Sequence, residues 1–170
     1  TQGLAVARMI AMSTYRSWSS FHHRFGRKLT LDPSTPDPST PYSPLPTPYA
    51  ITHYLHRHGQ KLVDRFDANT YITLTHAMDR HDVGGDHPST DPDQRYQSAL
   101  QSIHNPTLVV AIDSDILYPP AEQQELADLI PQAQLNWLYS PHGHDAFLID
   151  MENLNEQVMA FRHQWTLASR

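Results

Sequence analysis

Two short motifs in the last third of the chain carry side chains that could perform acid–base chemistry. The first contains Asp113 and Asp115, and the second contains His144, twenty-nine residues after Asp115, followed by Asp145. A histidine can take a proton from a hydroxyl group near neutral pH, because its unperturbed pKa is about 6.5. A carboxylate on the other ring nitrogen fixes the tautomer and stabilises the imidazolium that forms. The two motifs therefore offer the acid and the base of a Ser-His-Asp site.

The nucleophile of such a site is missing from the chain. No Gly-x-Ser-x-Gly elbow occurs, and the serines, including Ser114, lack the flanking glycines that a tight strand-to-helix turn requires. No cysteine is present that could replace the serine. By its own residues the chain is therefore not expected to form an acyl-enzyme.

Simpler explanations exist for both motifs. An aspartate after a strand is often a helix cap or a turn residue. His142 beside His144 and Asp145 would suit a metal cluster, but no other histidine or acid repeats with them at ligand spacing. We therefore predict no metal site and keep the capping role of the aspartates as an alternative.

The elements around the motifs indicate an α/β fold. Residues 107–112 form a short apolar, β-branched run that is typical of a strand buried in a parallel sheet. Pro119 and Pro120 can open a helix, residues 135–139 predict the next strand, and apolar residues at helical spacing predict a closing helix over 154–165. Since ligands bind beyond the carboxyl ends of such strands, Asp113 or Asp115 should meet His144 at one edge of the sheet.

The first hundred residues have a different, helical character. Apolar spacing predicts helices over 3–29 and 51–78, separated by a stretch at 31–48 that holds seven of the fourteen prolines. Proline fixes φ and removes a backbone donor, so that stretch is predicted to be an irregular loop. A second polar loop is expected over 84–93.

Composition narrows the function classes. The net charge of −6 argues against nucleic acid as a partner. No apolar run reaches the roughly 20 residues that span a bilayer, and no signal peptide opens the chain, so we expect a soluble, cytoplasmic protein without membrane contact. The chain begins without Met, which we interpret as a processed, cleaved or trimmed end.

The chain resembles the homoserine O-acetyltransferase family of α/β-hydrolase-fold acyltransferases of methionine biosynthesis. The matching segments follow one another in order and lie at 3–17, 24–27, 54–55, 59–61, 65–71, 81–83, 114–119 and 143–148. The proline-rich stretch looks like an insertion relative to bacterial members, which suggests a eukaryotic, fungal origin.

The resemblance implies a carboxy-terminal half. Residues 1–105 would be the helical lid region, with the insertion at 31–48 and the return to the core, and residues 106–170 the last strands and helices of the hydrolase core. An amino-terminal fragment of the same enzyme would then carry the serine nucleophile and the oxyanion hole. The assembled enzyme would be a homodimer.

The resemblance also implies roles for individual residues. The family transfers an acetyl group from acetyl-CoA, a co-substrate, to L-homoserine, and no bound cofactor is expected. His144 would be the base and Asp115 its orienting acid. Arg8 would bind the substrate carboxylate, Tyr15 would assist through its hydroxyl, and Asp145 would hold the substrate ammonium.

Other functions stay open at this point. The same fold could acetylate L-serine, use succinyl-CoA, or acylate another acceptor. A third hypothesis is not enzymatic: the chain could be a lid-and-dimerisation fragment that only provides an assembly surface.

Overall fold

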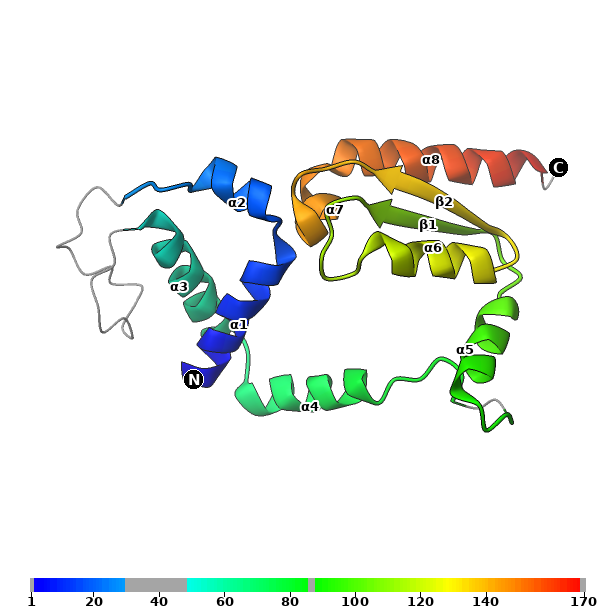
Figure 1. Ribbon diagram of the computed structural model, residues 1–170, viewed down its shortest axis with the longest axis horizontal. Coiled ribbons are helices and arrows are strands. Elements are labelled where there is room, and N and C mark those ends of the chain that lie inside the picture. The colour runs from blue at the N-terminus through cyan, green and yellow to red at the C-terminus, as the bar shows by residue number, and fades with distance from the viewer. Residues whose placement is uncertain (1, 30–48, 86–87, 169–170) are drawn as a thin grey trace. The chain divides into compact units, whose positions relative to one another are not determined.

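The computed structural model describes residues 2–29, 49–85 and 88–168, with side chains as far as residue 166. The chain divides into two compact units, Thr1–Arg80 and His81–Arg170, which are coloured from blue to green and from green to red in Figure 1. The predicted proline-rich loop at 31–48 lies outside the described residues. In the described part, no helix is long and apolar enough to cross a membrane.

The described residues of the amino-terminal unit form the helices α1 (Gln2–Tyr15), α2 (Trp18–Arg24), α3 (Ala50–Val63) and α4 (Ala68–Asp79). The helical character predicted for 3–29 is therefore divided between two helices. The break lies at Ser17, whose backbone is extended (φ −69°, ψ 160°) and whose Oγ accepts the Ser20 N–H at 3.0 Å. This N-cap begins a new helix instead of continuing the first.

Helices α1 and α3 pack closely against each other. At their contact, a Cβ on Gly59 would lie 2.9 Å from the Ala5 carbonyl oxygen, so only glycine fits there without a shift. Leu4, Met12 and Leu62 are the buried apolar residues of the two helices. The rings of Phe25 on the α2 side and of Tyr54 on α3 lie 5.0 Å apart.

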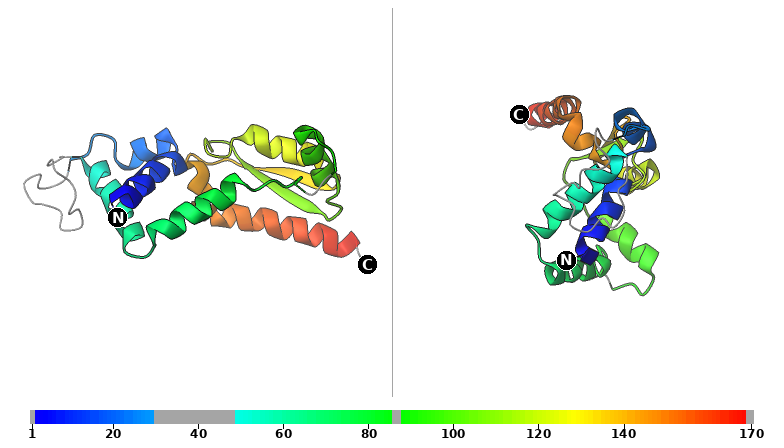
Figure 2. Two further views of the ribbon diagram at one scale, coloured as in Figure 1. Left: turned by 90° about the horizontal axis from the view of Figure 1, so that it is seen from below. Right: turned by 90° about the vertical axis from the view of Figure 1, so that its left-hand side faces the viewer.

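The carboxy-terminal unit alternates helices and strands. Its elements are α5 (Pro92–Gln101), β1 (Thr107–Ile112), α6 (Pro120–Leu129), β2 (Ala133–Leu138), a 3₁₀ turn (Gly143–Asp145), α7 (Ala146–Ile149) and α8 (Met151–Ala168). Strands β1 and β2 are parallel, in register from Thr107 opposite Ala133 to Ile112 opposite Leu138. Helices α6 and α8 lie on opposite faces of this sheet (Figures 1 and 2).

These elements confirm an α/β fold that consists mostly of helices with a small parallel sheet. The strand at 107–112, the helix after Pro119 and the closing helix are confirmed, while β2 begins two residues before the predicted strand and ends one residue earlier. Helix α5 was not predicted. Its signal is the pair Asp91 and Pro92, because the Asp91 carboxylate accepts the Asp93 N–H at 3.0 Å and proline suits a first helical turn. The boundary at residue 105 between lid and core stays a prediction.

Candidate active site

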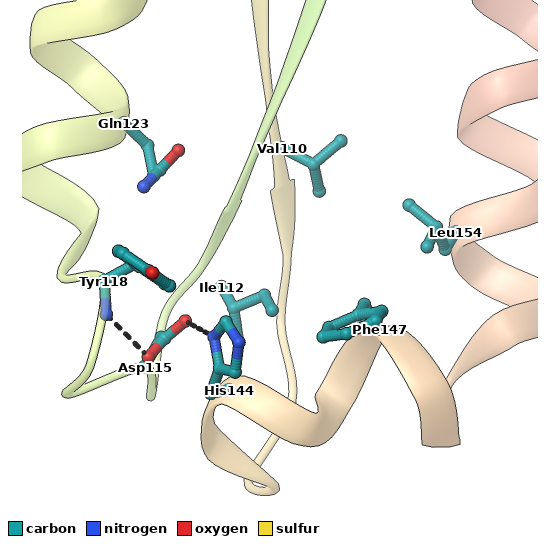
Figure 3. A pocket seen from close by; sticks show the side chains of 8 residues that line it. All are labelled: Val110, Ile112, Asp115, Tyr118, Gln123, His144, Phe147 and Leu154. Atoms are coloured by element: carbon teal, nitrogen blue, oxygen red, sulfur yellow. Dashed lines mark hydrogen bonds and ion pairs between the residues drawn. The ribbon is translucent and has the colours of Figure 1, made fainter. Parts of the chain in front are cut away.

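The loops that follow β1 and β2 meet at the carboxyl end of the sheet. Asp113, Ser114 and Asp115 follow β1, and the 3₁₀ turn Gly143–Asp145 follows β2. Because the strands are parallel, their carboxyl ends lie side by side. The Asp115 Oδ2 and the His144 Nδ1 are 2.8 Å apart (Figure 3). The structure thus brings the predicted acid and base together.

Asp115 is a buried carboxylate whose two oxygens both have hydrogen-bond partners. Its side chain is 5% exposed. Its Oδ1 accepts the backbone N–H groups of Leu117 at 2.8 Å and Tyr118 at 3.0 Å, and its Oδ2 faces His144. A buried charge is tolerated when hydrogen bonds replace water. Asp115 is therefore a turn residue and not the cap of α6, whose N-cap is Pro119, and the same carboxylate also contacts the histidine.

This contact determines the state of the imidazole. An ionised carboxylate only accepts hydrogen bonds, so the Nδ1 of neutral His144 carries the proton and donates a hydrogen bond to Asp115. The lone pair then lies on Nε2. This is the tautomer that a general base requires.

His144 opens into a pocket of about 270 Å³. The pocket combines an apolar wall with the acid and the base, and its lining residues, all labelled in Figure 3, are Val110, Ile112, Asp115, Tyr118, Gln123, His144, Phe147 and Leu154. The imidazole has the Tyr118 ring 5.1 Å and the Phe147 ring 5.5 Å away, centroid to centroid. The side chain of His144 is 23% exposed. The base is therefore oriented by its neighbours and still accessible from the pocket.

A second set of hydrogen bonds fixes the loop that carries His144. Ser114 Oγ donates to the Ser140 carbonyl and accepts the Gly143 N–H at 2.9 Å, while Asp113 Oδ1 accepts the Ser140 N–H at 2.8 Å. Gly143, at φ +70°, turns the chain from these bonds toward His144. We call Asp113, Ser114 and Ser140 the loop clamp. Asp113 thus bonds to the loop that carries His144 and not to the imidazole itself.

The remaining predicted residues fall in both units. In the amino-terminal unit, the Arg8 guanidinium carbon lies 5.4 Å from the centroid of the Tyr15 ring, and both residues are half-buried. In the carboxy-terminal unit, the half-buried Asp145 follows His144 in the 3₁₀ turn. The roles of all five residues stay predictions. Among the described residues, no group of three or more His, Cys, Asp or Glu side chains could hold a metal ion.

The loop clamp and the two aromatic neighbours of His144 were not predicted from the sequence. The clamp had a weak signal, since Ser114 lies between the two aspartates and Ser140 comes shortly after the next strand. Tyr118 and Phe147 each lie three residues from a predicted site residue. Nothing in their spacing indicates that both rings would pack around one imidazole.

Comparison with known proteins places the chain among named enzymes. No protein-family model matches it. It is 60% identical over 166 residues to a homoserine O-acetyltransferase of Nostoc punctiforme, a match of 98% of this chain and 42% of the relative. Proteins of the same name from Salinibacter ruber and Chlorobaculum tepidum are 49% and 45% identical over 95% and 96% of the chain, or 41% and 40% of their own lengths. The chain therefore spans about two fifths of the length of these curated relatives.

Proposed function

The chain is homologous to the carboxy-terminal part of the homoserine O-acetyltransferases, and we propose that it supplies the acid and the base of such an enzyme. The reaction is transfer of an acetyl group from acetyl-CoA to the hydroxyl of L-homoserine. The observation that carries the proposal is the 2.8 Å contact between Asp115 Oδ2 and His144 Nδ1 at the mouth of a pocket. In this proposal the fold is that of an α/β-hydrolase, with α1 to α4 as its helical lid.

The proposed mechanism has two half-reactions with one covalent intermediate. His144 Nε2 takes the proton of a serine hydroxyl, and the serine oxygen attacks the thioester carbonyl of acetyl-CoA. The imidazolium then protonates the departing CoA thiolate, which leaves an acetyl-serine. His144 next takes the proton of the homoserine hydroxyl, whose oxygen attacks the acetyl group; the serine oxygen leaves and takes the proton back from the imidazolium. Asp115 stays ionised throughout and stabilises the imidazolium.

Recognition of homoserine needs partners for its carboxylate and its ammonium. We assign the carboxylate to Arg8, whose planar fork of donors suits two oxygens. The Tyr15 ring beside that guanidinium keeps it oriented and offers a hydroxyl as an additional donor. We assign the ammonium to Asp145, which the 3₁₀ turn holds next to the base.

The serine nucleophile is proposed to come from an amino-terminal part of the same enzyme. Two observations support this partner. Among the described residues, β1 pairs only with β2, and an isolated two-stranded sheet is marginal, while parallel sheets are normally larger and covered on both faces. The relatives are also more than twice as long as the chain. We expect strands of the missing part to lie along the free edge of β1, which would bring their loops to the carboxyl edge with His144.

The test is reconstitution. The chain is coexpressed with the amino-terminal part, and CoA release is measured with acetyl-CoA and L-homoserine. His144→Ala should lower kcat by about 10³-fold or more, whereas His104→Ala, on an exposed loop, should leave kcat unchanged. Normal turnover in His144→Ala would exclude the proposed mechanism.

The same assay separates the alternative functions. L-serine replaces L-homoserine in one arm, and succinyl-CoA replaces acetyl-CoA in another. A preference for either replacement would change the substrate and keep the mechanism. A chain that is folded and dimeric, yet inactive with every pair of substrates, would support the assembly-surface hypothesis.

A further inference from the structure

Charge is divided unequally between the two units. Residues 1–80 contain nine Lys and Arg against five Asp and Glu, whereas residues 81–170 contain three against thirteen. Helices α1, α2 and α3 contain no acidic residue at all. A folded unit that concentrates one sign of charge repels itself, and it raises the local concentration of ligands of the opposite sign.

The cations gather on one face around the ring of Tyr54. The Arg24 guanidinium carbon lies 4.8 Å from the centroid of that ring, and the His58 ring lies 4.4 Å from it. Arg57 and Lys61 follow at positions that share this face of α3, since residues three and four apart are neighbours on a helix. We call Arg24, Arg57, His58 and Lys61 the basic face.

The charges of this face act on one another. Burial lowers the pKa of His58 most, and the charges of Arg8, Lys61, Arg24 and Arg57 lower it further. These groups come from all three helices around the imidazole, and none of them is an acid. Within the described ranges, no member of the basic face forms an ion pair. The positive field at His58 is therefore not neutralised by the described part of the unit.

The guanidinium of Arg24 is oriented so that it could bind an anion. Its guanidinium stacks over two rings, that of Tyr54 and that of Phe25 at 5.1 Å, while no described residue accepts a hydrogen bond from it. Stacking fixes the plane of a guanidinium and leaves its N–H edge available for the paired oxygens of a phosphate. Less rotamer freedom is then lost on binding.

We propose that the basic face binds a phosphorylated nucleotide, namely the phosphate-bearing end of the CoA thioester that donates the acyl group. The identity of this ligand rests on the proposed function. Several adjacent cations suit a multiply charged group better than the single carboxylate of an amino acid, which Arg8 would already hold. CoA carries a pyrophosphate and a further phosphate on its ribose, whereas its thiol end is uncharged.

The test measures binding without turnover. The full chain is titrated by calorimetry with 3′-phosphoadenosine 5′-phosphate, which has the nucleotide end of CoA without its thiol, and with adenosine. We expect 3′-phosphoadenosine 5′-phosphate to bind and adenosine not to bind. The affinity should fall as the salt concentration is raised from about 0.05 to 0.2 M, because screening of the charges strengthens over this range. Equal binding of adenosine, or an affinity that is insensitive to salt, would refute the basic face as a phosphate site.

Charge variants locate the site. Arg57→Glu combined with Lys61→Glu should weaken binding by at least tenfold, because two charges that attract a phosphate become charges that repel it. Arg80→Glu combined with Arg162→Glu, an equal change of charge at two exposed positions outside this face, should alter the binding little. Equal weakening by both variants would show that only net charge matters and would overturn the assignment. Circular dichroism verifies that each variant is folded.

His58 gives a readout that needs no variant. A bound phosphate offsets the surrounding positive charge, so the pKa of His58 should rise when the ligand saturates the chain, as followed by the imidazole resonance. An unchanged His58 pKa at saturation would contradict the proposal.

The reconstituted enzyme separates this proposal from the proposed function. If the double variant acetylates homoserine with an unchanged KM for acetyl-CoA, the basic face is not the phosphate site, while the proposed function stands. If the assembly binds the phosphorylated nucleotide but transfers no acetyl group, the phosphate site stands and the proposed function is wrong.

Discussion

Replacing Asp115 with asparagine exchanges one carboxylate oxygen for an NH₂ group and should remove the base. The remaining oxygen would still accept the backbone N–H groups of Leu117 and Tyr118. The opposite orientation of the amide would point its NH₂ at both donors. Each unpaired N–H would then destabilise the fold by about 1–3 kcal/mol. The NH₂ must then point to His144 Nδ1. It would donate to that nitrogen and move the imidazole proton to Nε2, where the lone pair is needed.

The expected loss follows from this tautomer. An imidazole protonated at Nε2 cannot take the proton of a hydroxyl, and the corresponding substitution in a serine protease triad lowers kcat by about 10⁴-fold. That factor equals about 5.5 kcal/mol of activation free energy. The free energy of unfolding should change by only about 1 kcal/mol, since both turn hydrogen bonds remain.

The assay is CoA release by the reconstituted enzyme, with Asp113→Asn as the matched control. Asp113 lies two residues away on the same loop, and its Oδ1 accepts the Ser140 N–H, which an asparagine oxygen would also accept. Asp113→Asn should therefore remain nearly as active as the unchanged enzyme. A loss of less than tenfold in Asp115→Asn, or equal losses in the two variants, would refute the argument from the tautomer.

Three further outcomes are expected. Ser114→Ala removes both hydrogen bonds of its hydroxyl to the loop that carries His144; it should cost about 1–3 kcal/mol in chemical denaturation and lower kcat less than Asp115→Asn does. Gly59→Ala places a methyl group 2.9 Å from a carbonyl oxygen of α1 and should destabilise the chain by about 1–3 kcal/mol, whereas Gly3→Ala, with nothing within 4 Å, should raise stability slightly; an equal effect of both on the midpoint would contradict the close packing. Asp67→Ala should reduce the helicity of α4 in circular dichroism at neutral pH. The hydrogen bond from the Thr70 N–H lowers the pKa of Asp67. The stabilisation by this N-cap is therefore fully present above the ordinary pKa of 3.8 and is lost as the pH falls through the lowered value. Helicity that is independent of pH would exclude the cap.

The sequence predicted the carboxy-terminal unit well because its signals are local and strong. The run at 107–112 is short, apolar and β-branched, and Pro120 fixes the start of the helix that follows it. The helix boundaries of the amino-terminal unit were harder to predict. Apolar spacing continues across Ser17, so periodicity alone could not show that its hydroxyl caps a second helix. Helix α5 was missed because its composition is polar and its cap signal lies in what reads as a loop.

The same contrast holds for the site. Parallel topology predicted that Asp115 and His144 would meet, because both follow strands of one sheet. The choice of Asp115 over Asp113 came from the resemblance, since the spacing allowed either. The structure supplies a physical basis for it: Asp115 points its carboxylate at the imidazole, while Asp113 bonds to the backbone of the opposite loop. Side-chain direction depends on the turn after β1, which periodicity does not describe.

Asp115 and His144 both belong to one β–α–β unit, so their contact does not depend on the amino-terminal unit. Residues 107–145 contain both strands, helix α6, the loop clamp and the contact between Asp115 and His144. The tautomer of His144 is therefore determined by short-range structure within the carboxy-terminal unit. Substitutions on the basic face should change the KM for the acyl donor and leave the pH dependence of kcat unchanged, because the proposed base belongs to the other unit.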